Sequence, residues 1–392
     1  MTLTRQGFYE QHRQIFSWYN AENYACYDVL TVSEETVQGV KNAAEKAWKI
    51  LLKAGEVMKA LSDDALLEFG YPPEALRLIR STTQPPFIAR CDFAVTENGI
   101  FLLECNAEVA TFVVETFKMN GIVANHFGKQ DPNKDSERAL KTQLNSYIDL
   151  IAKSINKSPH DCHIAFSALS EADEDIGTVS YLRSLCAYDS ILYPIDFIEM
   201  DEDGIYDNTG KKLDIIYRLY PTEWMIEDKD PNSNCNLWDY FEPLAAFNKV
   251  LLINPVSSFI LQNKALLALI TMLGEDFFES NDLTGFSHFL PTFIEKTQIV
   301  EPFVAKPTFG REGKEVKIYK DGNKSAYNQS HEYADLMDVY QEYVDLPKIQ
   351  LEGDIYTLQI SCFLVNGIPT GVSSRIGDMV IGNTSRFLPI GY

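Results

Sequence analysis

The sequence predicts a mixed α/β fold, and three observations support that prediction. Residues 1–80 carry helical patterns, strands and helices alternate after about residue 160, and strand signals dominate the last quarter of the chain. Alternating strands and helices favour a partly parallel sheet, whereas successive strands favour antiparallel pairing. With 392 residues and 45% hydrophobic content, the chain can form two or three subdomains. We divide it into residues 1–80, 81–250 and 251–392.

Composition and charge argue against several classes of function. The formal net charge is −22 and the pI is about 4.7, which argues against nucleic acid or an anionic membrane as a partner. No apolar run approaches the ~20 residues that span a bilayer, and the first residues lack the continuous apolar segment of a signal peptide. The seven cysteines form no C-x-x-C pair and the six histidines are scattered, so we expect no zinc site. The sequence therefore predicts a reduced, cytoplasmic protein.

The first eighty residues are predicted to be packing helices. Ser33 begins a helix whose apolar residues, from Val37 to Leu52, recur with a helical period. Pro72-Pro73 interrupts the pattern and opens a short helix over 73–80. No motif in this region points to chemistry.

Strands and helices alternate in the middle of the chain. We expect helices at Thr111–Ala124, Ser136–Asn156 and Val179–Cys186, and strands at His163–Leu169, Ser190–Ile198 and Leu213–Tyr220. A helix from about Ser257 carries Lys264 within an otherwise apolar surface. From Ile299 the strand signals continue, with Asn366-Gly367 as a tight turn.

The chain is organised around a predicted β-hairpin near residue 100. Two apolar-rich runs flank the turn signal T-E-N-G. If the loop consists of residues 97–99, Asp92 faces Glu104 and Arg90 faces Asn106. Side chains two residues apart share one face of a strand, so these four side chains project together.

The four side chains form a chemical pattern. Two opposed carboxylates repel unless something positive lies between them, and the hard oxygens of Asp92, Glu104 and Asn106 suit Mg2+. With Arg90 beside it, such a cation could hold the phosphates of a nucleotide. The alternative is a solvated acidic face on which Arg90 pairs locally with Asp92. The neighbouring Cys91 lies on the other face of the strand, in the expected core.

A second pattern is the segment from Phe303 to Gly313, which reads FVAKPTFGREG. Lys306 ends a strand, where its ammonium suits a phosphate, and Gly310 lets backbone N–H groups approach phosphate oxygens closely. The spacing fits neither a Walker loop nor a Rossmann turn. By itself such a hairpin is more often structural. Together with the carboxylate hairpin it favours nucleotide binding.

These motifs resemble those of the glutathionylspermidine synthase family, a permuted group of ATP-grasp ligases. The pattern R-x-D-F, turn, E-x-N resembles the family's magnesium hairpin, and KPTFGREG resembles its K-P-x-x-G-R-E-G motif. The segments QNKALL (262–267), YQEYV (340–344) and NTSRF (383–387) resemble its lysine helix, its adenine linker and its closing strands. The resemblance runs from the hairpin to the C-terminus. It implies an ATP-grasp fold with a preceding pre-ATP-grasp α/β domain.

The resemblance also implies roles for residues of this sequence. Asp92, Glu104 and Asn106 would bind Mg2+. Arg90 would be catalytic, because it would stabilise charge on the transferring phosphoryl group. The nucleotide-binding residues would be Arg90, Cys91, Asp92, Lys264, Lys306, Gly313, Gln341, Arg375 and Asp378. The implied cofactors are ATP and Mg2+, and the implied reaction joins a small-molecule or peptide carboxylate to an amine through an acyl phosphate.

Acidic residues suggest where the amine binds. Glu174 and Asp175 follow a predicted strand and precede a helix, where they could hold a polyamine-like cation together with Glu223. The alternative is a solvated loop. The chain departs from the family pattern at Thr222, where an aromatic residue is common, and at Gly382, where a lysine is common. Two other functions therefore stay open: a ligase of the same fold for another peptide or acid and amine, and a non-catalytic nucleotide-binding regulatory protein.

Overall fold

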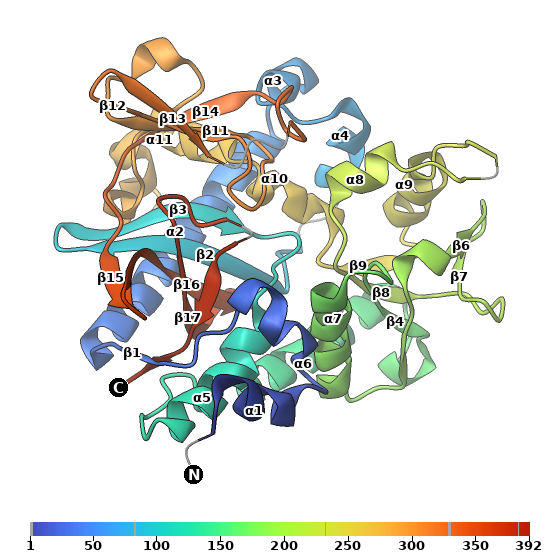
Figure 1. Cartoon of the computed structure of the whole chain (residues 1–392). Helices are drawn as coiled ribbons and strands as arrows, with labels where there is room; N and C mark the ends of the chain where they lie inside the picture. The colour runs from blue at the N-terminus through green and yellow to red at the C-terminus, as the bar shows by residue number, and fades with distance from the viewer. Residues whose placement is uncertain (1–2, 82–83, 232, 328–330, 383) are drawn as a thin grey trace.

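The computed structural model describes residues 3–81, 84–231, 233–327, 331–382 and 384–392. Within these residues, three sheets of four or more strands form the framework, and helices pack between and around them (Figure 1). The predicted mixed α/β class is confirmed.

The central sheet holds the predicted hairpin. Its strands are antiparallel and follow the order β18-β17-β16-β2-β3, with β15 paired to β16. Their bounds are β2 Ile88–Thr96, β3 Gly99–Asn106, β15 Lys348–Leu351, β16 Asp354–Val365, β17 Ile368–Gly377 and β18 Arg386–Leu388. The hairpin β2–β3 therefore shares one sheet with strands that follow it by about 250 residues in sequence. Helix α2 (Glu34–Lys59) begins at Ser33 as predicted and packs its apolar face against this sheet.

The hairpin turn differs from the prediction, but the predicted pairing of Asp92 with Glu104 is confirmed. Thr96 pairs with Gly99, so the loop has two residues rather than three. A β-bulge at Leu103 then shifts the pairing back by one residue. As a result Asp92 still faces Glu104, as the three-residue loop predicted.

A second sheet is parallel throughout, as the alternation of strands and helices predicted. Its order is β5-β4-β8-β9, with bounds β4 Ile164–Ser167, β5 Ser190–Leu192, β8 Ile215–Arg218 and β9 Leu251–Ile253. The predicted strand Ser190–Ile198 ends early, because a 3-10 turn follows Pro194. Helix α7 (Asp173–Leu185) starts before the predicted Val179. Glu174 and Asp175 therefore lie in its first helical turn, where carboxylates are favoured, and not in a loop.

The third sheet lies at the top of Figure 1 and is antiparallel. Its order is β10-β14-β11-β12-β13, with bounds β10 Thr292–Phe293, β11 Phe303–Pro307, β12 Val316–Lys320, β13 Asn323–Tyr327 and β14 Asp338–Glu342. The glycine-containing segment 308–315 joins β11 to β12 as an irregular loop, as the sequence predicted.

The predicted helix around Lys264 is broken. Helices α10 (Phe259–Gln262) and α11 (Ala265–Glu279) are separated at Asn263-Lys264, and the break bends this helical pair by 68°. The Asn263 side chain accepts a hydrogen bond from the Ala265 N–H, which satisfies one of the free donors at the start of α11. Lys264 therefore lies at a helix start and not on a helix face.

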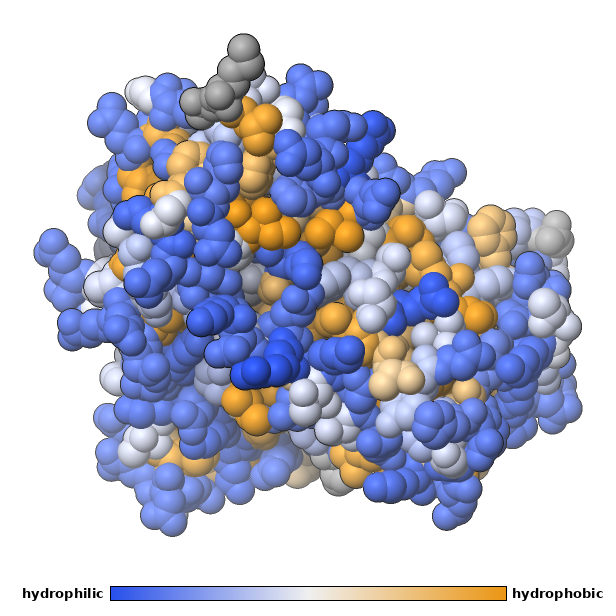
Figure 2. Space-filling model, turned by 90° about the horizontal axis from the view of Figure 1, so that it is seen from below, coloured by the Kyte–Doolittle hydropathy of each residue, from blue (hydrophilic) through white to orange (hydrophobic). Residues whose placement is uncertain are grey.

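In the described part of the chain, no single helix is long and apolar enough to cross a membrane. The bent pair of α10 and α11 passes that test by length and composition only, and most of its residues are buried inside the protein. Seen from below, the surface is mostly hydrophilic, and apolar residues gather only in scattered patches (Figure 2).

The remaining elements surround these sheets. The helical ones are α1 Arg5–Tyr9, η1 Glu10–His12, η2 Ser17–Asn23, α3 Asp63–Glu68, η3 Pro73–Ala75, α4 Leu76–Ile79, η4 Glu115–Met119, α5 Asn120–His126, α6 Ser136–Ser154, η5 Pro159–Asp161, η6 Ile195–Phe197, α8 Thr222–Glu227, α9 Trp238–Ala246, η7 Val256–Ser258, η8 Phe286–His288 and η9 Lys296–Gln298. Two small sheets pair β1 Leu30–Thr31 with β19 Ile390–Gly391 and β6 Glu199–Met200 with β7 Ile205–Tyr206. The short helix predicted over 73–80 is confirmed as η3 and α4. The segment predicted as the helix Thr111–Ala124 contains a π-helical turn, η4.

Candidate active site

Two neighbouring cavities lie between the central sheet, the third sheet and α7. The larger has a volume of about 450 Å³ and the smaller about 310 Å³. They share Glu104 on β3, the glycines at 310 and 313, and Ile381. Gly313 has a φ of +65°, and a Cβ there would lie 2.8 Å from Val380. Only glycine therefore fits this close approach between the loop 308–315 and the chain beyond β17.

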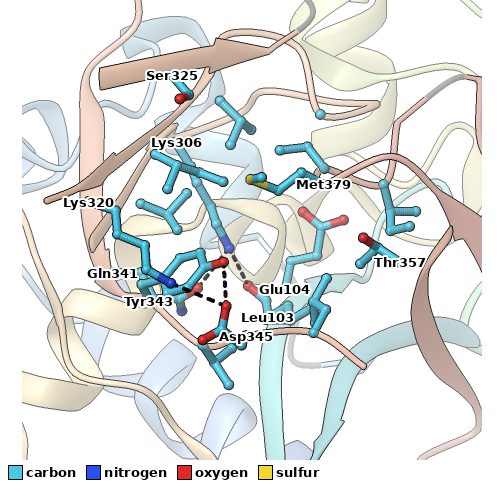
Figure 3. A pocket seen from close by; sticks show the side chains of 18 of the residues that line it. Leu103, Glu104, Lys306, Lys320, Ser325, Gln341, Tyr343, Asp345, Thr357 and Met379 are labelled. Carbon is cyan, nitrogen blue, oxygen red and sulfur yellow. Dashed lines mark hydrogen bonds and ion pairs between the residues drawn. The ribbon is translucent and has the colours of Figure 1, made fainter. Parts of the chain in front are cut away.

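Lys306 points into the larger cavity from β11 (Figure 3). Its Nζ donates to Gln341 Oε1 at 2.7 Å and to the Leu103 carbonyl at 3.2 Å. Burial and the neighbouring Lys264 ammonium lower the pKa of Lys306 to about 8, although the Glu104 carboxylate opposes the shift. Lys306 can thus serve as a phosphate partner whose charge depends on pH near neutrality.

Lys264 reaches the same cavity because of the helix break. Its Nζ donates to the Gly310 carbonyl at 2.6 Å and lies 3.3 Å from Glu104 Oε2. Its backbone N–H donates to the Thr308 carbonyl. Lys264 is only 7% exposed. Its contacts hold the start of the glycine loop against β3, and its ammonium supplies a positive charge to the cavity.

Glu104 is the acidic centre between the cavities. Burial raises the pKa of its carboxyl, but Lys264, Lys306 and the two arginines at 90 and 375 outweigh burial and lower that pKa to about 2. Glu104 is therefore ionised at neutral pH and surrounded by cations.

Asp92 lies directly opposite Glu104 and is completely buried. Its carboxylate accepts five hydrogen bonds: two from Arg90 at 2.9 and 3.1 Å, and one each from Ser361 (2.7 Å), Arg375 (2.9 Å) and Asn106 (3.3 Å). The predicted repulsion between the two carboxylates is thus compensated by side chains of the protein. This arrangement agrees with part of the alternative interpretation of the sequence, in which Arg90 pairs locally with Asp92, but both residues are buried and not solvated.

The predicted magnesium ligands fit a divalent cation to different degrees. Glu104 is ionised and lines both cavities, and Asn106 lines the smaller one, so these two fit an oxygen-ligated ion. Both oxygens of Asp92 are already used by arginine and hydroxyl donors. The described residues include no group of three or more His, Cys, Asp or Glu side chains arranged to hold a metal.

The smaller cavity has charges of both signs. Arg90 and Arg375 line one part of it, and Glu174 and Asp175 line another. Burial and the charge of Glu115 raise the pKa of Glu174 to about 8. Burial and Glu312 raise that of Asp175 to about 6. Such carboxyls are poised to bind or exchange protons with a cationic group.

Glu223 belongs to a buried ion-pair network beside the smaller cavity. It accepts from Arg311 Nε at 2.6 Å, and Arg311 also lies 3.6 Å from Glu108. Glu108 in turn accepts from Arg218 at 2.6 Å and from the backbone and hydroxyl of Thr222. The network ties the glycine loop to the parallel sheet and to α8. Thr222, at which the sequence departs from the family pattern, therefore belongs to this network.

Sequence reasoning missed several of these residues. Glu108 continues the alternation that starts at Glu104 and Asn106, so its position in the sequence could have revealed it. Ser361 and Glu115 have no comparable signal, because only the fold brings them near the hairpin.

The other predicted residues are placed as follows. Gln341 lines the larger cavity, and Gly382 lines the smaller one. Cys91 is buried with its Sγ 3.5 Å from that of Cys105, on the core side of the hairpin, and its side chain lines neither cavity. Asp378 is exposed and lies outside both linings of the described residues, next to Met379, which lines the larger cavity. Asn383, at the start of NTSRF, lies outside the described residues.

Comparisons with known proteins agree with this architecture. The family model described as glutathionylspermidine synthase preATP-grasp matches residues 2–391. A glutathione synthetase-like effector from Globodera pallida, solved in its apo form, superposes with a TM-score of 0.59 at 10% identity and covers 99% of this chain and 98% of that one. A putative gamma-glutamylcysteine synthetase from Methylobacillus flagellatus KT gives a TM-score of 0.46 at 11% identity, covering 83% and 86%. The family match and the first superposition confirm the predicted ATP-grasp-type fold.

Proposed function

The chain belongs to the glutathionylspermidine synthase family, a family of synthetases, and on this premise we propose that it is an ATP-dependent ligase. It joins a small-molecule or peptide carboxylate to an amine through an acyl phosphate. The observation that supports this most strongly is the contact between two cavities of different chemistry at one ionised carboxylate, Glu104.

The larger cavity suits ATP. Lys264 and Lys306 supply two positive charges for the phosphates, and the loop containing Gly310 and Gly313 lies beside them. The lining also includes apolar side chains, among them Val304, Ile318 and Leu346, which suit the base. The nucleotide's terminal phosphate would then lie toward Glu104 and the smaller cavity.

The smaller cavity suits the acid and the amine. Arg90 and Arg375 can orient a substrate carboxylate and spread the negative charge that develops on the transferring phosphoryl group. Glu104 and Asn106, with Asp92 behind them, would hold Mg2+, which neutralises phosphate charge. Glu174 and Asp175 face the same space and suit a cationic amine. Nothing in this reaction needs a nucleophilic side chain of the protein.

The test is a substrate panel with Mg-ATP. Peptides and amino acids with free carboxylates, beginning with glutathione, are combined with amines, beginning with spermidine, and with hydroxylamine. We expect at least one acid to give stoichiometric ADP and amide, and to give a hydroxamate when hydroxylamine replaces the amine. Which acid responds also distinguishes glutathione from another peptide substrate.

A protein that binds ATP but shows no turnover with any of the acid–amine pairs in the panel would contradict the proposal. That result would favour the non-catalytic nucleotide-binding alternative. Arg90→Lys serves as a variant in the same assay, because it keeps the charge but loses the bidentate contact with Asp92. We expect it to lower turnover more than ATP affinity.

A further inference from the structure

We propose that Glu174 accepts a proton from the attacking amine and that Glu115, buried behind the cavity, is a positioning residue for it. This inference rests on the proposed ligase function and names the group that activates its second substrate. Glu174 lines the smaller cavity together with Arg90, so it lies in the space where acid and amine would meet.

Glu115 is held by residues from the start of the chain. It is completely buried in the π-helical turn η4 and accepts from Trp18 Nε1 at 2.7 Å and from the Tyr24 hydroxyl at 2.9 Å. Its second oxygen, Oε2, is buried and has no hydrogen-bond partner among the described residues. Trp18 packs against Gly177 of α7, where a Cβ would lie 2.1 Å from its ring. The η2 segment therefore fixes Glu115 and contacts the helix that carries Glu174.

Tyr24 links the buried Glu115 to the cavity. Its hydroxyl donates to Glu115, and its ring lines the same cavity as Glu174. Burial raises the pKa of Glu115. The pKa of Glu174 is raised first by burial and next by the charge of Glu115. The charged and titratable groups that act on this pair are Tyr24, Arg90, Asp175, Glu312 and Arg375.

The raised pKa suits the chemistry of an amine. An alkylammonium must lose a proton before its nitrogen can attack, and an ordinary carboxylate is far too weak a base to take it efficiently. A carboxyl with a pKa of about 8 is much closer to an ammonium. The positive charge of the bound amine favours the ionised form of Glu174, which then accepts the proton.

The proton balance of the step is complete. The ammonium gives one proton to Glu174, and the neutral amine attacks the acyl carbon. The C–O bond to the phosphate breaks as the C–N bond forms, and the second N–H proton leaves with the phosphate. Glu174 returns its proton to solvent before the next cycle.

The experiment compares nucleophiles that need a base with one that does not. The acid is the one that gives a hydroxamate with the wild-type protein in the substrate panel. The nucleophiles are an alkylamine, spermidine first, and hydroxylamine, whose nitrogen is largely unprotonated at pH 7. The variants are Glu174→Gln and Glu115→Gln, which keep side-chain size. Glu199→Gln, an exposed carboxyl on β6, is the control.

We expect Glu174→Gln to lower kcat with the alkylamine by ~10²-fold or more and to lower kcat for hydroxamate formation far less, because hydroxylamine needs no base. Glu115→Gln removes a charge that raises the pKa of Glu174, so the pH–rate profile with the alkylamine should shift to lower pH. The hydroxylamine profile should not move. This last comparison separates positioning from a merely structural role of Glu115.

Equal losses with both nucleophiles, or full activity of Glu174→Gln with the alkylamine, would overturn the inference. A wild-type protein that forms hydroxamates but uses no alkylamine would also overturn it. Failure of the wild-type protein to form any hydroxamate would instead contradict the proposed ligase function.

Discussion

Asp92→Asn tests whether the buried carboxylate of Asp92 stabilises the fold as well as belonging to the candidate site. Asp92 is completely buried and accepts hydrogen bonds from two arginines, Arg90 and Arg375. An amide in its place leaves both guanidinium groups without a full counter-charge. Removing one partner from a buried ion pair costs about 3–5 kcal/mol, so we expect the free energy of unfolding to fall by about that amount.

The assay is urea denaturation at pH 7, followed by circular dichroism, on wild type, Asp92→Asn and a matched control. Glu97→Gln is that control, because Glu97 is exposed at the turn of the same hairpin. We expect the control to change the unfolding free energy by less than about 0.5 kcal/mol. An Asp92→Asn protein as stable as the control would refute the conclusion that Asp92 compensates the two arginines.

Three further variants test the charges of the site. Glu104→Gln should lower the unfolding free energy by up to about 3 kcal/mol at pH 7, because the native pKa lies near 2 instead of 4.5. That contribution is present above pH 4.5 and lost as the pH falls toward 2, so wild type and variant should converge in acid. Glu174→Gln should have the opposite effect, a gain in unfolding free energy of up to about 3 kcal/mol at pH 7 that vanishes below pH 4. The reason is that a pKa raised to about 8 destabilises the folded state by an amount that grows as the pH rises from 4.5 to 8. Denaturation at pH 7 and pH 4 measures this effect, and an unchanged or lower stability at pH 7 would contradict it. In wild type, ATP affinity should weaken as the pH rises through 8, since the Lys306 ammonium loses its proton there. In calorimetric titrations Lys306→Met should bind ATP more weakly than wild type below pH 8, and its affinity should no longer change with pH around 8. A pH dependence that persists in the variant would contradict the role of Lys306.

Local patterns in the sequence were sufficient to predict which side chains of the hairpin face each other. Alternation along the two strands placed Asp92 opposite Glu104 correctly, even though the loop is one residue shorter than predicted. The loop is one residue shorter than predicted and the β-bulge adds one residue, so the two changes of register cancel and Asp92 still faces Glu104. The prediction succeeded because the face of each strand, not the turn, decides which side chains meet.

The sequence did not predict the contacts between residues that are far apart in the chain. Nothing in the pattern around Lys264 predicted that Asn263 would break the helix and turn the lysine toward the glycine loop. Ser361 and Glu115 reach the site only because distant strands and the η2 segment pack against the hairpin region. The helix start at Asp173 was missed because a first helical turn rich in carboxylates resembles a polar loop.

The most direct test of the central claim follows oxygen from the acid to the phosphate. The carboxylate of the acid selected by the panel is labelled with oxygen-18 and incubated with Mg-ATP, the alkylamine and the wild-type protein. An acyl phosphate requires one labelled oxygen in each phosphate released, together with ADP. Unlabelled phosphate, or AMP with labelled product, would contradict it.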